Sequence, residues 1–171
     1  MTESPNVVSA ARRIPAPASR IFAVLADPRR HPEIDGSGMV KCALTTQPVA
    51  GVGDVFVMAM HNAEMGDYEM TSQVVEYEPD RTIAWEPVLT AATREEDKDG
   101  IGEPAHYRWS YTLTPDGENV TVVTETYDCT DAPAWLQKVV KGGQRWLPTM
   151  EVTLQRIEDV TSSTPTPSGD R

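Results

Sequence analysis

Hydrophobic and polar positions alternate through the middle of the chain in a pattern typical of β-strands. From Met39 onward, segments rich in Val, Thr, Tyr and Met are separated by Gly, Pro, Asn and Asp, which are turn residues. The predicted strands are Met39–Gln47, Val55–His61, Tyr68–Glu78, Thr82–Pro87, Ala105–Thr114 and Asn119–Asp128. Most connections between them are short, which predicts antiparallel pairing.

The N-terminal region predicts one further strand and two short helices. Val7–Arg13 has strand character and ends before Pro15. Ser19–Ala26 has the apolar spacing of a short helix, and Pro28 and Pro32 leave room for only one more short turn of helix after it.

The C-terminal region predicts a long amphipathic helix from Ala132 to about Val160. Its expected sheet-facing stripe is Leu136, Val139, Trp146, Met150 and Leu154. Gly142-Gly143 and Pro148 lie inside it and predict a kink. Residues 161–171 are small and polar apart from the last two charges, so we expect a single domain over 1–160 followed by a disordered tail.

Length and composition are typical of one globular domain. The chain has 171 residues, 39% of them hydrophobic and 24% charged. The longest apolar run, Ile21–Ala26, is far too short to cross a bilayer, so we expect no membrane insertion and a cytoplasmic location. Cys42 and Cys129 show no metal-ligand spacing and are expected to be two buried thiols.

The acidic charge is concentrated in the middle of the chain. The formal net charge is −11, and Cys42–Asp131 contains four basic and eighteen acidic residues. Such a segment repels phosphate groups, which argues against nucleic acid and against anionic membrane surfaces as partners.

The predicted order of elements is that of an α+β fold, and four segments carry a family resemblance. These are RRIPAPASRIFAVLADPRRHPEIDG (Arg12–Gly36), GVGDVF (Gly51–Phe56), VVEYEPDRTIAWE (Val74–Glu86) and YTLTPDGENVTVVTETYD (Tyr111–Asp128). The chain resembles the polyketide cyclase/dehydrase and lipid-transport family of the START-related, Bet v 1-like superfamily. The resemblance implies a helix-grip fold, in which a curved seven-stranded antiparallel sheet wraps around a long C-terminal helix, with two short helices between the first two strands. It also implies a cavity between the sheet and that helix.

Strand parity predicts which side chains face this cavity. In Ala105–Thr114 the odd positions are mostly aromatic, whereas His106 and Arg108 point to water. A turn with an even number of residues at Pro79-Asp80 would place Val74 beside Trp85. The predicted ligand-binding residues are Met58, Met60, Tyr68, Met70, Trp85, Tyr107, Trp109, Tyr111, Trp146 and Met150. The alternative is that they fill a solid core.

Three titratable residues are candidates for chemistry. His31 and Asp35 could form an acid–base pair, although a turn or capping role is favoured. Glu125 faces solvent if the loop at Pro115-Asp116-Gly117 has an even number of residues, and it faces the cavity if that number is odd. The sequence leaves both possibilities open. In the cavity, burial would raise its pKa and suit it to proton transfer.

No metal or cofactor is predicted. Glu95–Gly100 has the alternating acids of a calcium loop, but His106 occupies the twelfth position, where a bidentate Glu is needed. We interpret the segment as a polar flap over one end of the grip.

Three functions therefore remain. The first is binding of a small hydrophobic molecule of the lipid, polyketide or isoprenoid type. The second is an enzyme of the cyclase, aromatase or dehydratase kind that uses the same cavity. The third is a protein-interaction role like that of the chaperone-activator branch of the superfamily. In each case we expect a monomer or a homodimer.

Overall fold

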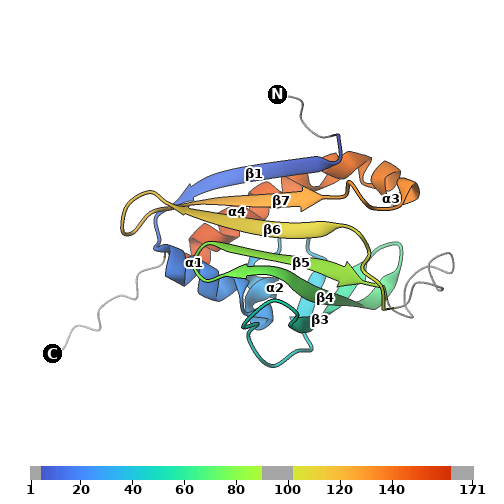
Figure 1. The fold of residues 1–171 in the computed structure, drawn as a ribbon, viewed down its shortest axis with the longest axis horizontal. Coiled ribbons are helices and arrows are strands. Elements are labelled where there is room, and N and C mark those ends of the chain that lie inside the picture. Colours follow the sequence, from blue (N-terminus) through green and yellow to red (C-terminus); the bar gives the residue numbers. More distant parts are fainter. Residues whose placement is uncertain (1–4, 90–101, 163–171) are drawn as a thin grey trace.

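The computed structural model describes residues 5–89 and 102–162. Its strands are β1 (Val7–Ile14), β2 (Val40–Ala43), β3 (Val55–Asn62), β4 (Gly66–Glu78), β5 (Thr82–Val88), β6 (Arg108–Pro115) and β7 (Thr121–Asp128). They form one antiparallel sheet in the order β1-β7-β6-β5-β4-β3-β2 (Figure 1). The helix-grip prediction is confirmed, and Val74 pairs with Trp85 as expected. The even turn predicted at Pro79-Asp80 is wrong, because Glu78 pairs with Thr82 around a loop of residues 79–81. A register shift between Val74 and Glu76 restores the expected pair.

Three strands are shorter than predicted. β7 begins at Thr121 rather than Asn119, and β2 is shortened at both ends, to Val40–Ala43. β2 lies at the sheet edge, and its register with β3 shifts between Val40 and Cys42. The predicted Ala105 start of the sixth segment moves to Arg108, because His106 has a left-handed φ of 61° that interrupts the extended backbone. Cys42 is exposed on the edge strand, so the expectation of two buried thiols holds only for Cys129.

The predicted helical segment between the first two strands has three pieces, α1 (Ala18–Leu25), the 3₁₀ helix η1 (Pro28–Arg30) and α2 (His31–Ile34). α1 buries its apolar face, which includes Ile21 and Leu25. Asp27 starts η1 by accepting hydrogen bonds from the backbone and the guanidinium of Arg29.

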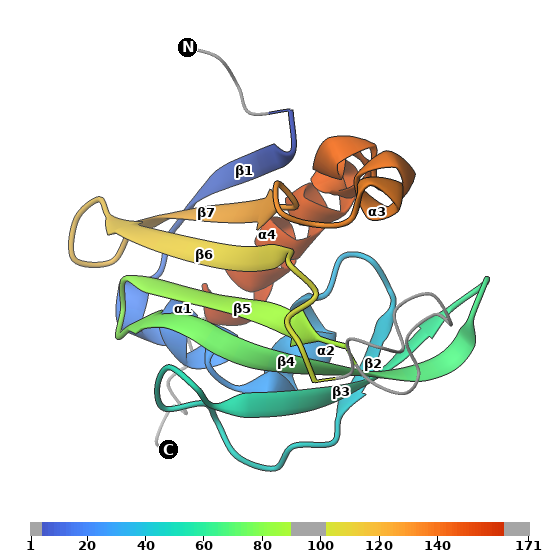
Figure 2. The ribbon, with the colours of Figure 1, turned by 45° about the vertical axis from the view of Figure 1, so that its right-hand side comes forward.

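The C-terminal helix is broken where the glycines predict a kink. Its parts are α3 (Ala134–Val139), the 3₁₀ helix η3 (Lys141–Trp146) and α4 (Leu147–Thr161). Gly142 and Gly143 have φ values of 63° and 98°, which strongly favour glycine. As Figure 2 shows, α3 sits at one end of the sheet while α4 runs along its concave side.

Two expectations for this region need correction. Val139 is 44% exposed and does not pack on the sheet, because α3 ends there and Val140 turns inward instead. Thr161 is buried as the last residue of α4, so the helix extends one residue into the segment predicted as a tail. Residues 163–171 lie outside the described residues. No described helix has the length and apolar character needed to cross a membrane.

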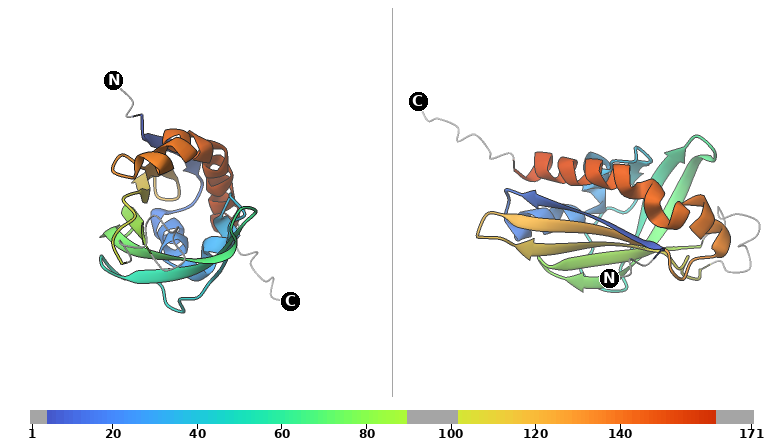
Figure 3. Two further views of the ribbon diagram at one scale, coloured as in Figure 1. Left: turned by 90° about the vertical axis from the view of Figure 1, so that its right-hand side faces the viewer. Right: turned by 90° about the horizontal axis from the view of Figure 1, so that it is seen from above.

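The buried side chains form two clusters on the concave face of the sheet. Figure 3 shows this face curving around α1 and α2, with α4 closing the open side. The larger cluster includes Phe56, Met58 and Tyr111. The smaller cluster includes Tyr127 and Val140 near the break in the C-terminal helix. Residues from both clusters border a space that neither fills.

Candidate functional site

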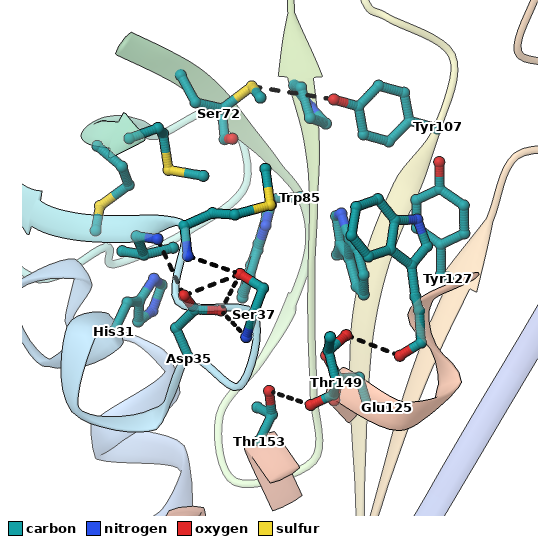
Figure 4. A pocket seen from close by; sticks show the side chains of 18 of the residues that line it. His31, Asp35, Ser37, Ser72, Trp85, Tyr107, Glu125, Tyr127, Thr149 and Thr153 are labelled. Carbon is teal, nitrogen blue, oxygen red and sulfur yellow. Dashed lines mark hydrogen bonds between the residues drawn. The ribbon is translucent and has the colours of Figure 1, made fainter. Parts of the chain in front are cut away.

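A cavity of about 290 Å³ lies between the concave face of the sheet, the segment that follows α2 and the helices η3 and α4. Its walls are mostly aromatic, sulfur-containing and aliphatic side chains. In the view of Figure 4, His31 and Asp35 lie on one side and Tyr107 and Tyr127 on the other. The cavity thus occupies the position that the fold implied.

The structure places nine of the ten predicted residues in the cavity wall. They are Met58, Met60, Tyr68, Met70, Trp85, Tyr107, Trp109, Tyr111 and Trp146. Met150 is the exception, since it is fully buried in the smaller cluster with Val8 and Tyr127. On α4 the residues that line the cavity are Thr149 and Thr153, which lie on another face of the helix.

The aromatic wall follows from the alternation on β6 and its neighbours. Trp85 pairs with Trp109 across β5 and β6, and Trp109 packs on Tyr127 with 4.6 Å between ring centroids. Tyr107 adds a polar contact, since its hydroxyl lies 4.0 Å from the Met70 sulfur. The predicted outward direction of Arg108 is confirmed, because it pairs with Glu86 at 3.0 Å on the exposed face.

A second hollow of about 400 Å³ adjoins the cavity at the end of the grip near α3. The two spaces share wall residues Met39, Tyr68, Met70, Pro87, Tyr107, Leu136, Val140 and Trp146. Arg145 lines only the outer hollow, where its guanidinium lies 5.7 Å from the centroid of the Trp146 ring. The outer hollow therefore extends the inner cavity toward the surface.

Glu125 faces the cavity because the loop between β6 and β7 has an odd number of residues. Pro115 pairs with Thr121, which leaves residues 116–120 as the loop and sets Glu125 opposite Tyr111. Glu125 is 3% exposed, and the Tyr111 hydroxyl donates a 2.8 Å hydrogen bond to its Oε1. Burial raises the pKa of Glu125 to about 8, with a smaller contribution from the charge of Asp35, and the hydrogen bond from Tyr111 opposes this.

His31 combines a structural role with a place in the cavity wall. Its Nε2 lies 2.8 Å from the Leu25 carbonyl oxygen, and its ring stacks on Trp85 at 5.3 Å. Because a carbonyl only accepts, Nε2 carries the proton and Nδ1 the lone pair. Burial lowers the pKa of His31, so its ring is neutral at neutral pH.

Asp35 has the turn role that was favoured for it. Its carboxylate accepts hydrogen bonds from the Ser37 backbone and hydroxyl and from the Val40 backbone. These bonds hold the segment between α2 and β2 in place as one wall of the cavity. His31 and Asp35 therefore do not form a direct acid–base pair, although both border the same space.

Several wall residues were not predicted. They are Ile34, Ser37, Met39, Val40, Phe56, Ser72, Pro87, Tyr127, Leu136, Val140, Thr149 and Thr153. The alternation of side chains along a strand could have identified two of them. Phe56 shares the inward face of β3 with Met58, and Ser72 shares the inward face of β4 with Met70. Thr149 and Thr153 had no apolar signal in the sequence, because threonine is polar. In the structure their hydroxyls donate to the carbonyl oxygens of Trp146 and Thr149.

The wall of the inner cavity contains acidic side chains but, among the described residues, no side chain with a permanent positive charge. Among the described residues no lysine or arginine lines it, whereas Asp35 and Glu125 both do. The described part of the chain also contains no cluster of His, Cys, Asp or Glu suited to a metal ion. Glu95–Gly100, considered as a calcium loop, lies outside the described residues.

Comparison with known proteins agrees with this architecture. Residues 6–160 match the family model described as polyketide cyclase/dehydrase and lipid transport. The uncharacterized protein Rv0088 of Mycobacterium tuberculosis strain H37Rv is 32% identical over 124 residues, which cover 72% of this chain and 48% of that protein. The chain thus spans about half the length of the curated relatives that it matches.

Solved structures show the same fold at low sequence identity. Protein NE0264 of Nitrosomonas europaea superposes with a TM-score of 0.68 at 13% identity, covering 94% of this chain and 97% of that one. Norcoclaurine synthase of Thalictrum flavum, in complex with dopamine and hydroxybenzaldehyde, gives 0.60 at 14% identity, covering 94% and 88%. With the family match over most of its length, this chain belongs to the polyketide cyclase/dehydrase and lipid-transport family.

Proposed function

We propose that this chain binds a small, mostly apolar molecule in the inner cavity. The observation that carries the proposal is the wall itself, in which Met, Trp, Tyr and Phe side chains surround about 290 Å³ of space. Such a wall with a few polar groups suits an apolar ligand with a small number of oxygen or nitrogen atoms. Methionine side chains adapt to more than one ligand shape. Lipids, polyketides and isoprenoids are all molecules of this class.

The size of the two spaces supports a ligand that extends from the inside toward the mouth. The inner cavity is at the lower limit of the ~300–1,000 Å³ that is common for drug-sized ligands. The outer hollow of about 400 Å³ shares a wall with it. A ring system in the inner cavity could therefore carry a chain or substituent that passes Tyr107 and Trp146.

Native mass spectrometry tests the binding proposal. The protein is measured freshly purified and again after addition of the uncharged apolar probe N-phenyl-1-naphthylamine. We expect one bound molecule per chain, either co-purified or added, and its release with unchanged mass on denaturation. Protein that binds neither a co-purified molecule nor the probe would contradict the proposal.

A second candidate function is an enzyme of the cyclase, aromatase or dehydratase kind. One observation favours it, namely the buried Glu125 beside Tyr111 in the same cavity wall as the neutral His31. A protonated Glu125 could give a proton to a carbonyl oxygen while the His31 Nδ1 lone pair accepts a proton from the adjacent carbon, which forms an enol. His31 then returns a proton to that carbon while the Glu125 carboxylate takes back the proton on oxygen, which restores the ketone and both side chains.

Exchange of carbon-bound hydrogen separates this candidate from simple binding. The methyl protons of 2-acetylnaphthalene are followed by proton NMR in D₂O with and without protein. Catalysis predicts faster exchange with the wild type and a loss of that acceleration in Glu125→Gln. An exchange rate equal to that of buffer would leave binding as the function.

A further inference from the structure

One oxygen of the buried Glu125 carboxyl group has no hydrogen-bond partner among the described residues. Oε1 accepts the hydrogen bond from Tyr111, whereas Oε2 is buried and makes none within the described part of the chain. A buried polar atom without a partner is uncommon in folded proteins and destabilises the fold. Its position in the cavity wall suggests that a bound molecule supplies the missing partner.

The described elements around Glu125 leave it no other partner. On β1 the paired residue is Ala10, which has no polar side chain, and on β6 it is Tyr111, whose proton is already donated. From α4 the polar wall residues are Thr149 and Thr153, and their hydroxyl protons go to the carbonyl oxygens of Trp146 and Thr149.

The protonation of Glu125 decides which kind of atom can pair with Oε2. Because burial raises its pKa to about 8, the carboxyl group is mostly neutral at pH 7. Oε1 accepts the Tyr111 proton, so the acidic proton belongs on Oε2. Oε2 is then a donor that faces a ligand with an acceptor.

The remaining charges in the inner cavity disfavour an anionic ligand. Asp35 is the other carboxyl group in the wall, His31 is neutral, and the described wall residues include no lysine or arginine. A ligand carboxylate placed beside Glu125 would therefore lose its water without gaining a cationic partner.

We propose that the ligand of this cavity carries an uncharged oxygen acceptor, such as a ketone, ester or aldehyde carbonyl, which receives a hydrogen bond from Oε2 of Glu125. The proposal rests on the proposed binding function and narrows its ligand class. Free fatty acids and other carboxylates are disfavoured at this position, whereas oxygenated neutral polyketides, isoprenoids and lipid esters fit it.

Three probes of nearly equal size test the proposal. They are the ketone 2-acetylnaphthalene, the hydrocarbon 2-isopropenylnaphthalene and the carboxylate 2-naphthoate. The affinity of each is measured by equilibrium dialysis at about pH 6. At this pH naphthoate is charged and Glu125 is neutral. We expect the ketone to bind about three- to tenfold more tightly than the hydrocarbon, as one hydrogen bond provides. The carboxylate should bind most weakly.

Variants assign the preference to Glu125. Glu125→Leu should remove the advantage of the ketone over the hydrocarbon, whereas Glu125→Gln should keep it because the amide retains an N–H donor. Glu151→Gln changes an exposed residue of α4 and should leave all three affinities unchanged. Thermal unfolding of each variant checks that the fold is intact.

The outcomes separate this proposal from the broader one. If the ketone binds no better than the hydrocarbon, or the carboxylate binds best, the inference about the oxygen acceptor is wrong while cavity binding stands. If Glu125→Leu folds and keeps the ketone preference, Glu125 is not the donor. If none of the three probes binds the wild type, the proposed binding function itself is wrong.

Discussion

The hydroxyl group of Tyr111 donates a 2.8 Å hydrogen bond to Oε1 of Glu125, at a position where β6 and β7 pair directly. This contact fixes one oxygen of a buried carboxyl group and leaves the other unpartnered among the described residues of the cavity wall. The pair is a polar feature in an otherwise mostly apolar space, so both the stability of the protein and its choice of ligand should depend on it.

The stability of the protein should depend on pH through Glu125. Its pKa of about 8 in the folded state lies above the ordinary value of 4.5, because burial disfavours the charged form. Between these values the folded state keeps a proton that the unfolded state releases, so the free energy of unfolding falls as pH rises. The loss reaches at most about 5 kcal/mol, at 1.36 kcal/mol for each pKa unit. Urea unfolding from pH 4.5 to pH 8.5 measures it.

Glu125→Gln is the control for this pH dependence. His31 and Asp27 have lowered pKa values and contribute with the opposite sign, since their stabilisation is lost as pH falls. They act equally in both proteins, so the difference between wild type and Glu125→Gln isolates Glu125. A difference that stays constant across this pH range would show that Glu125 is charged in the folded state.

Removing the Tyr111 hydroxyl should weaken the fold and raise the pKa of Glu125 further. Tyr111→Phe deletes the donor to Oε1, which should cost about 1–3 kcal/mol at pH 5. The same hydrogen bond lowers the pKa of Glu125 in the folded state, so without it the decline in stability should begin at the same pH and continue to a higher pH. Tyr77→Phe, at a ring that packs on Phe22, is the matched control and should do neither. Equal effects of the two variants would contradict the assigned role of the hydroxyl.

Truncation at the cavity wall should cost less than truncation in the packed core. Trp109 lines the cavity, so Trp109→Ala should lose less than the ~3–5 kcal/mol usual for a packed Trp, and affinity for an apolar probe should change. Leu113 lies on the same face of β6 within the larger cluster, and Leu113→Ala should cost about 2–5 kcal/mol. A greater loss for Trp109→Ala, together with no probe binding by the wild type, would indicate a filled core.

The contact of Gly36 with α4 should tolerate no side chain. A Cβ there would overlap the Thr149 carbonyl oxygen and lie 2.8 Å from the Thr153 backbone nitrogen. Gly36→Ala should therefore destabilise the protein by about 1–3 kcal/mol, as overpacking does. Gly51→Ala, where a Cβ meets no atom within 4 Å, should be close to neutral. Similar unfolding free energies for the two variants would show that α4 can move away without cost.

The sequence predicts the fold and much of the cavity wall because both depend on local patterns. Alternation on β6 places Trp109 and Tyr111 inward whatever the neighbouring loops do. The orientation of Glu125 depends instead on whether the β6–β7 loop is odd or even, which no local pattern determines. The same holds for Met150, because the break at Gly142 and Gly143 sets how α4 is rotated about its axis.

Binding of N-phenyl-1-naphthylamine, followed by its fluorescence, tests the central claim that the inner cavity takes up an apolar molecule. The comparison is between the wild type, Ser72→Leu and Thr71→Leu. Ser72 is buried in the cavity wall, so a leucine there should fill part of the space, whereas Thr71 precedes it on the opposite face of β4. We predict saturable binding by the wild type and by Thr71→Leu, and at least about tenfold weaker binding by Ser72→Leu. No saturable binding by the wild type, or equal affinity of all three proteins, would contradict the account.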